Sequence, residues 1–298
     1  MKRMIYKGAE AYAVENDRIR AVFTVRGSKM VSLFDKKIGR EYLLQAGEKL
    51  EQGGYGDDYN AYKQCGFDEM FPTIDECFYD RFPWEGARLP DHGEVWGLDW
   101  SCGVKSGALR MEVHGVRLPY KLTKTARLAG ESRLRISYRA DNLSPFDMDF
   151  VWAAHAMFVL EQGSALIVPD RPKNCILTYS HFGILGKYGE YVAVRDALAN
   201  DADVFMDKYY FDGAVKPGRC GVRHADGSGC TISFPTKTVP YLGLLPSRGL
   251  HIGHCAIVEP CTAAFDRPDA ARRRGMESVL PGGGSRTWYL EFTLEGNV

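Results

Sequence analysis

Residues 287–294 read Thr-Trp-Tyr-Leu-Glu-Phe-Thr-Leu, and their pattern decides the fold class. The apolar residues Trp288, Leu290, Phe292 and Leu294 fall on every second position. Because successive side chains of a β-strand point to opposite faces, this alternation predicts a strand with one buried face. Such strands are typical of antiparallel sheets, in which one face packs on the core and the other meets solvent.

The same period of two recurs along the chain. It is found in three further stretches, 18–25, 109–113 and 133–140. Turn signals separate these runs, and only two short stretches, 194–202 and 269–275, indicate helices. We therefore predict an all-β protein, a large antiparallel β-sandwich with few short helices. No linker divides the sequence, so residues 1–298 are expected to form a single domain.

The composition limits the classes of partner. Among 298 residues, Lys and Arg together count 38 and Asp and Glu also count 38, so the formal net charge is zero. Nucleic-acid-binding proteins usually carry a basic excess, so no nucleic acid is expected. No run of 18 apolar residues predicts a membrane span, and the first residues do not resemble a secretory signal. Eight cysteines without a Cys-x-x-Cys pair then indicate reduced thiols in a cytoplasmic protein.

The segment from Gln45 to Trp100 breaks the strand rhythm and is rich in Gly, Tyr, Trp, Phe and Asp. A long irregular stretch in a compact domain is usually functional or disordered, and the aromatic content argues against disorder. Aromatic rings beside carboxylates and amides suit sugars, which have apolar faces and polar rims. A structured covering loop without a ligand role is the other interpretation, and the sequence favours neither.

Two isolated ionisable residues lie in apolar runs. Glu259 ends the run 254–258, and His155 stands alone within 150–160. Because burying a charge is costly, such a carboxylate is either neutralised by a partner or held ready for proton transfer. One acid and one base on strand-like segments suggest acid–base chemistry. The structural alternatives are a hydrogen-bonded core histidine and a salt bridge from the glutamate to Arg272, Arg273 or Arg274.

A second histidine, His92, lies in a loop that also contains proline, glycine and tryptophan. A histidine beside glycine can approach a ligand closely, because glycine leaves the backbone unobstructed. The alternative is a loop histidine that is bonded to Asp91 or Glu94.

Metal-binding patterns are weak. His251 and His254 would point to opposite faces of a strand and poorly suit a zinc pair. Asp147 and Asp149 would share a strand face and could bind a cation, although a solvated rim is the simpler interpretation. No nucleotide-binding fingerprint is present. The sequence therefore predicts neither a metal nor a cofactor.

An ordered set of landmarks resembles the aldose 1-epimerase family of the galactose mutarotase-like superfamily. They are the Phe-Pro stretch 66–74, the Asp-His-Gly loop 91–93, the strand 154–158, the Glu-Pro segment 257–263 and the closing turn and strand 279–294. The resemblance covers nearly the whole chain. Where the family often places an arginine near the Phe-Pro stretch, this chain has Asp68 and Glu69.

The resemblance implies a galactose mutarotase-like supersandwich with its site in a cleft on one sheet. It implies an isomerase that interconverts the α and β anomers of a reducing sugar, with His155 as general acid and Glu259 as general base. By the same resemblance, His92 and Asp207 would bind the sugar, and Trp96 could stack on its ring. The partner would be a monosaccharide or related small carbohydrate, bound by a monomer or a homodimer without any cofactor.

Other functions stay open. A non-catalytic carbohydrate-binding protein could use the same cleft. A mutarotase for phosphorylated sugars would need a basic cluster there, with Lys63, Lys208 and Arg81 as possible members. A lyase or hydrolase on a similar sandwich is a third possibility, because a fold does not determine a function.

Overall fold

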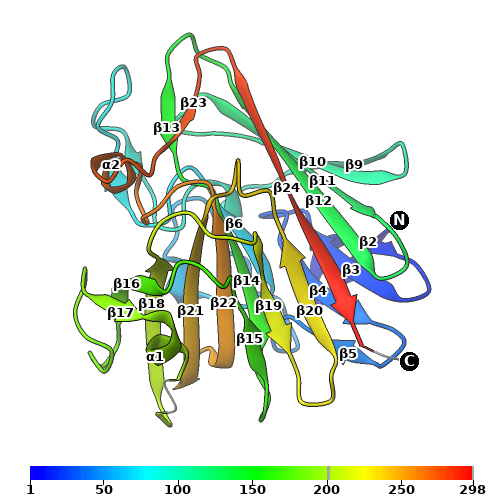
Figure 1. The fold of residues 1–298 in the computed structure, drawn as a ribbon. Coiled ribbons are helices and arrows are strands. Elements are labelled where there is room, and N and C mark those ends of the chain that lie inside the picture. The colour runs from blue at the N-terminus through cyan, green and yellow to red at the C-terminus, as the bar shows by residue number, and fades with distance from the viewer. Residues whose placement is uncertain (200–201, 297–298) are drawn as a thin grey trace.

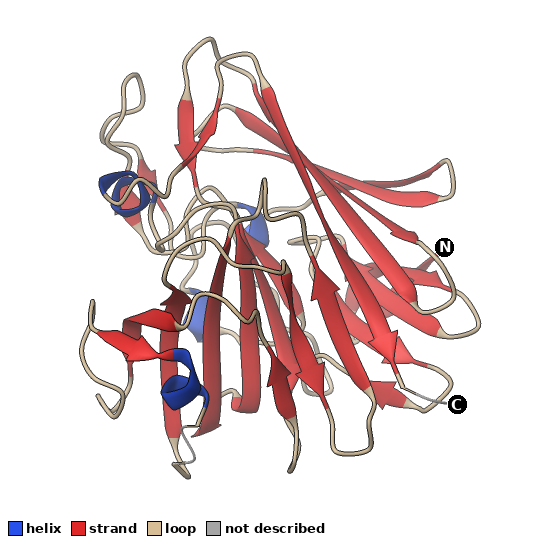
Figure 2. Ribbon diagram, viewed as in Figure 1, coloured by secondary structure: helices blue, strands red, loops and turns tan. Residues whose placement is uncertain are grey.

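The computed structural model describes residues 1–199 and 202–296, which form long antiparallel strands and few helices (Figure 1, Figure 2). Two large sheets carry most of the strands. The prediction of an antiparallel all-β protein is confirmed, because every pair of named strands in the described part is antiparallel.

The larger sheet has 12 strands, which come from the N-terminal part of the chain and from residues 153–261. In spatial order they are β1 (Lys2–Tyr6), β2 (Ala9–Glu15), β3 (Ile19–Thr24), β4 (Met30–Asp35), β6 (Phe67–Met70), β14 (Ala153–Val159), β22 (Gly253–Cys261), β21 (Tyr241–Leu250), β18 (Phe205–Phe211), β16 (Asn174–Ser180) and β17 (Tyr191–Ala193), with β5 (Arg40–Glu41) beside β4.

The second sheet has 8 strands, and the red β24 runs diagonally along it in Figure 1. In order they are β15 (Ala165–Ile167), β19 (Arg219–Arg223), β20 (Gly229–Ser233), β24 (Ser285–Glu295), β12 (Arg133–Asn142), β11 (Tyr120–Leu128), β10 (Ala108–His114) and β9 (Ser101–Lys105). Two small ribbons pair β13 (Met148–Phe150) with β23 (Ser278–Leu280), and β7 (Cys77–Phe78) with β8 (Arg88–Leu89).

The helices are short. They are α1 (Val194–Leu198), α2 (Pro268–Arg273) and the single 3₁₀ turns η1 (Tyr59–Ala61) and η2 (Val95–Gly97). α1 lies within the predicted stretch 194–202, of which residues 200–201 are outside the described residues, and α2 begins one residue before the predicted stretch 269–275. Proline at the first position of α2 starts that helix without losing a hydrogen bond. In the described part, no helix is long and apolar enough to cross a membrane.

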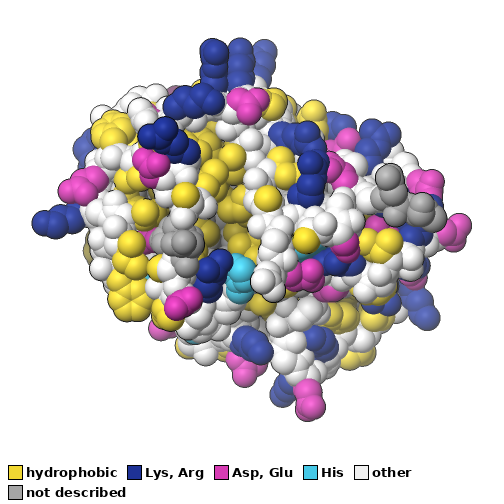
Figure 3. Space-filling model, turned by 60° about the horizontal axis from the view of Figure 1, so that its bottom comes forward, with side chains coloured by type: hydrophobic (Ala, Val, Ile, Leu, Met, Phe, Trp, Pro, Cys, Tyr) yellow, Lys and Arg dark blue, Asp and Glu magenta, His cyan; other side chains and the backbone are white. Residues whose placement is uncertain are grey.

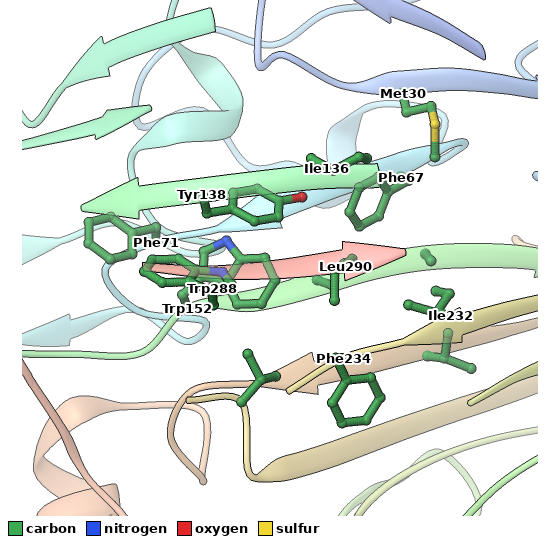
Figure 4. Packing of buried hydrophobic residues seen from close by; sticks show 14 of the residues in the cluster. Met30, Phe67, Phe71, Ile136, Tyr138, Trp152, Ile232, Phe234, Trp288 and Leu290 are labelled. Carbon is green, nitrogen blue, oxygen red and sulfur yellow. The ribbon is translucent and has the colours of Figure 1, made fainter. Parts of the chain in front are cut away.

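The apolar faces of the two sheets pack together to form the core. On β24, Trp288, Leu290, Phe292 and Leu294 are all buried, which confirms the face that their alternation predicts. Figure 4 shows Trp288 and Leu290 packed among aromatic and aliphatic side chains from both sheets. On one face of the molecule, hydrophobic side chains gather in a central hollow, and basic and acidic side chains both lie around it (Figure 3).

A buried ion pair also joins the two sheets. Lys124 of β11 lies 2.8 Å from Glu69 of β6, and both side chains are fully buried. The ammonium also donates to the backbone oxygen of Ser28 at 2.7 Å, and the Tyr138 hydroxyl donates to Glu69 at 2.8 Å. The polar atoms of this pair are therefore satisfied within the core.

Candidate functional site

One row of residues crosses five neighbouring strands at the centre of the larger sheet. On β14, His155 pairs with Asp68 of β6, and the register of β14 against β22 places His155 opposite Glu259. On the far side, Glu259 pairs with Gly243 of β21, which pairs with Tyr210 of β18. Because paired residues share a face of the sheet, the predicted acid and base lie side by side. His155 is only 3% exposed and Glu259 only 1%.

The Glu259 carboxylate lies close to Gly243, whose lack of a side chain leaves room for it. A methyl group at Gly243 would stand 2.9 Å from Glu259 Oε2, so any larger residue there would press on the carboxylate. Neither carboxylate oxygen accepts a hydrogen bond from the residues that the structure describes. Burial raises the pKa of Glu259, and the ammonium of Lys208, 3.2 Å from Oε2, opposes that rise.

The cationic neighbour of Glu259 is therefore a lysine and not one of the three arginines considered above. Lys208 also pairs with Asp266 at 2.7 Å, and the Tyr210 hydroxyl donates to the same Asp266 oxygen at 2.7 Å. Burial works to lower the pKa of Lys208, but the carboxylates of Asp266 and Glu259 leave it raised, so the side chain is a cation. Lys208 and Asp266 are each about a tenth exposed and are where the cluster meets solvent.

The arginines that follow Asp266 in the sequence bind other partners. Arg272 pairs with Asp80 and Asp149, and Arg273 pairs with Asp269. Because Asp149 is also paired with Arg81, its carboxylate is neutralised by two guanidinium groups and is not a cation ligand. In the described residues, no group of three or more His, Cys, Asp and Glu side chains is arranged to hold a metal ion.

His155 is in contact with a tyrosine from the irregular segment. The Tyr59 hydroxyl lies 3.4 Å from His155 Nδ1 and donates to Asp68 Oδ2 at 2.7 Å. The same Asp68 oxygen lies 3.1 Å from the Lys29 ammonium. Burial, reinforced by nearby cationic side chains, lowers the pKa of His155 well below its usual value. The imidazole is therefore neutral at neutral pH in the ligand-free site.

His92 reaches the same place from its loop. Its ring stacks on Tyr59 with centroids 3.8 Å apart and lies 5.7 Å from the ring of His155. The backbone at His92 has a positive φ of 59°, and Gly93 follows so close to Phe71 that a Cβ would lie 2.4 Å from its backbone oxygen. His92 Nδ1 also lies 2.8 Å from Asp91, so the expected loop contact and the position beside His155 occur together.

Asp207 does not join the cluster. It precedes Lys208 on β18, so the two side chains point to opposite faces of the sheet. Asp207 accepts a hydrogen bond from the Ser180 hydroxyl, while Lys208 stands beside Glu259. Lys208 and not Asp207 is therefore the residue of β18 beside Glu259, and sugar binding by Asp207 stays a prediction.

Trp96 packs against Tyr59, and both residues lie in the irregular segment. Its ring meets Tyr59 edge-on at 5.1 Å, and its indole N–H donates to the backbone oxygen of Asp91 at 3.2 Å. Together with Tyr59 and Asp68 it lines a cavity of about 30 Å³, which admits water but not a sugar. The irregular segment therefore covers this part of the site, and within it Trp96 supports Tyr59.

Three side chains of this cluster were not considered as site residues, Tyr59, Asp68 and Asp266, and Lys208 was considered only as a cation for a phosphorylated sugar. A charged residue at the centre of the aromatic run 205–211 was a usable signal for Lys208, because such a strand buries both faces. Tyr59 gave no such signal, since it lies in a segment without periodicity.

Comparisons with known proteins bear on the fold. No model of a protein family matches the sequence, and no curated protein matches it. Among solved structures, the Slr1438 protein from Synechocystis sp. PCC 6803 is 17% identical with a TM-score of 0.74, and the match covers 100% of both chains. A galactose mutarotase-like protein from Clostridium acetobutylicum is 15% identical with a TM-score of 0.72, and the match covers 99% of this chain and 98% of that one.

A candidate aldose 1-epimerase from Escherichia coli K12 is 15% identical with a TM-score of 0.70, and the match covers 96% of this chain and 99% of that one. At such identities the similarity concerns the fold. The chain has the galactose mutarotase-like fold, which confirms at that level the resemblance inferred from its motifs.

Proposed function

We propose that the protein is an aldose 1-epimerase-like isomerase that interconverts the α and β anomers of a reducing sugar. One observation carries the proposal: a buried imidazole and a buried carboxylate occupy opposite positions on the neighbouring strands β14 and β22, and the carboxylate of Glu259 accepts no hydrogen bond in the described part of the chain. An unsatisfied buried carboxylate costs stability, so its presence supports a role toward a ligand. Solved structures with this fold include a candidate aldose 1-epimerase.

Mutarotation requires two proton transfers. The sugar ring opens when the C1 hydroxyl loses a proton and the ring oxygen gains one, and after rotation about C1–C2 the ring closes by the reverse transfers. We assign the first transfer to the carboxylate of Glu259 and the second to protonated His155. Each positioned transfer typically accelerates a reaction by about 10²–10⁴-fold. The chemistry calls for neither a metal nor an organic cofactor.

The pKa shifts bear on which group starts as the acid. Burial raises the pKa of Glu259 and lowers that of His155, which favours the uncharged carboxyl and imidazole in the ligand-free site. The uncharged pair, carboxyl and imidazole, and the charged pair, carboxylate and imidazolium, hold the same number of protons. They differ only in whether one proton lies on Glu259 or on His155. Lys208 favours the carboxylate, because its charge lowers the pKa of Glu259. The pair can therefore supply one acid and one base from either starting form.

The charges around the pair favour a neutral sugar over a phosphorylated one. Of the three basic residues considered, Lys208 is already paired with two carboxylates, and Arg81 is paired with Asp149. Lys63 lines the small cavity that includes Tyr59. A phosphate would need unpaired cations near the sugar. We retain a single domain, a cytoplasmic location and a monomeric or dimeric state as predictions from the sequence.

The test is an NMR measurement of anomer exchange over a panel of free and phosphorylated monosaccharides. We expect acceleration with at least one free sugar, and we expect Glu259→Gln and His155→Ala each to abolish it with the fold intact. The matched control is His114→Ala, at the exposed end of β10. If both variants keep the wild-type rate on an accelerated sugar, the proposal is wrong. Binding of a sugar without acceleration would favour the non-catalytic carbohydrate-binding function.

A further inference from the structure

Tyr59 is buried at the point where the covering segment meets the candidate acid–base pair. Its ring stacks on His92 and meets His155 edge-on at 5.8 Å. Its hydroxyl stands between two polar groups, 2.7 Å from Asp68 Oδ2 and 3.4 Å from His155 Nδ1. The 3.4 Å contact is longer than an ordinary hydrogen bond, as is common for site contacts before a ligand binds.

The distances decide the direction of the single phenolic hydrogen. The Tyr59 hydroxyl donates to Asp68, because that contact is much the shorter and a carboxylate can only accept. The Lys29 ammonium forms an ion pair with the same Asp68 oxygen at 3.1 Å. Burial and the Asp68 charge raise the pKa of Tyr59 well above its usual value, so the phenol keeps its proton.

The Tyr59 oxygen therefore presents only lone pairs to His155. A neutral imidazole carries one N–H, and the two ring nitrogens differ in which one holds it. With an acceptor facing Nδ1, the hydrogen belongs on Nδ1. Nε2 then carries the free lone pair, and it makes no hydrogen bond to the residues described in this structure. Nε2 is the nitrogen left for a ligand.

We propose that Tyr59 is a positioning residue that, held by Asp68 and Lys29, keeps the hydrogen of neutral His155 on Nδ1 and presents Nε2 to the substrate. The inference rests on the proposed function for its catalytic meaning and identifies Nε2 as the atom that exchanges a proton with the sugar. In the protonated state the same contact leaves the Nε2 hydrogen directed to the substrate. Lys29 lies between β3 and β4, Asp68 on β6 and Tyr59 in η1. Their contacts therefore connect three separate segments to His155 on β14.

The test is a long-range ¹H–¹⁵N NMR correlation on the full-length protein at a pH where His155 is neutral. His155→Asn identifies its signals among those of the 7 histidines. We expect wild-type His155 to show a protonated Nδ1 and an unprotonated Nε2. An unprotonated Nδ1 in the wild type would overturn the proposal without any variant, so a failure to fold cannot obscure the answer.

Tyr59→Phe removes only the hydroxyl and keeps the ring that packs on His92. We expect the population of the Nδ1–H form to fall, because free imidazole side chains prefer the hydrogen on Nε2. The matched control is Tyr62→Phe, whose hydroxyl bonds Asp57 in the same segment and should leave the His155 signals unchanged. An unchanged tautomer in Tyr59→Phe would also overturn the proposal.

Activity gives a separate measurement. On an accelerated sugar, Tyr59→Phe should lower kcat by about 10-fold or more with little change in KM, because it disturbs a supporting contact and no sugar contact. A correct tautomer in a protein that accelerates no sugar would leave the positioning role standing and reject the isomerase function. Acceleration of a sugar by a protein in which His155 has the opposite tautomer would support the isomerase function and reject the positioning role of Tyr59.

Discussion

Two lysine–glutamate pairs are buried in the part of the chain that the structure describes, and they differ in how completely their polar atoms are satisfied. In the core, Lys124 and Glu69 form an ion pair, and each also binds one further group. Lys124 donates to a backbone oxygen, and Glu69 accepts from a tyrosine hydroxyl. On the site face, Lys208 and Glu259 lie 3.2 Å apart, but neither Glu259 oxygen has a hydrogen-bond partner in the described residues.

Burial alone therefore does not separate structural from functional charges. Both glutamates are almost fully buried, and burial raises the pKa of both. What differs is the number of groups that the fold itself supplies. A fully satisfied buried pair acts as a structural tie, whereas removal of one partner leaves an uncompensated charge. A carboxylate that receives no hydrogen bond from the protein can accept hydrogen bonds from a ligand.

The largest effect should come from breaking the core pair. We expect Lys124→Met to lower the free energy of unfolding by about 3–5 kcal/mol, because Glu69 would be left as an unpaired buried charge. Urea titration measures this. The double variant Lys124→Met/Glu69→Leu should recover part of the loss, since it removes both charges. A loss below about 1 kcal/mol in the single variant would contradict the comparison.

Removing the lysine of the site pair should change the pH dependence of activity. The Lys208 charge lowers the pKa of Glu259 and also that of His155. In Lys208→Met both pKa values should rise, so both limbs of the kcat/KM profile should move to higher pH. The limb of Glu259 should move further, because that carboxylate contacts the ammonium directly.

The control is Lys208→Arg, which keeps the charge and should keep both limbs near their wild-type positions. Asp266 retains its hydrogen bond from Tyr210 in both variants. Limbs that stay in place in Lys208→Met would mean that they do not report Glu259 and His155.

The smallest effect on stability should come from neutralising the site glutamate. Glu259→Gln removes one of the two carboxylates that Lys208 contacts, and Lys208 keeps its pair with Asp266. We expect the free energy of unfolding to change by less than about 1 kcal/mol, while anomer exchange is lost. Urea titration beside the Lys124→Met protein gives the direct contrast. A loss as large as in that variant would make Glu259 a structural residue.

The sequence predicted those features that depend on local pattern. The alternation at 287–294 gave the buried face of β24, and charged residues in apolar runs gave His155 and Glu259, which the structure places side by side. Asp207 and Lys208 show the limit of such patterns. In a strand that is buried on both faces, the sequence does not reveal which residue points to which side, and a shift of one residue reverses the answer.

Contacts between distant segments were outside the reach of local patterns. Tyr59 lies in a segment with no period, and its place beside His155 follows from the path of a long loop across the sheet. Lys124 occupies an inward position of an alternating strand, and its partner Glu69 lies in a different sheet. Neither partner can be identified without the three-dimensional arrangement.

The consecutive carboxylates of β6 have a consequence for how this fold can vary. Asp68 reaches Tyr59 on the site face, and Glu69 reaches Lys124 on the core face. A slip of β6 by one residue would put one of these carboxylates in the place of the other and an apolar residue, Phe67 or Met70, in the place that it left. Any slip therefore breaks the contact with Tyr59 and the ion pair with Lys124, so insertions or deletions before β6 must be accommodated in the preceding loop without moving the strand.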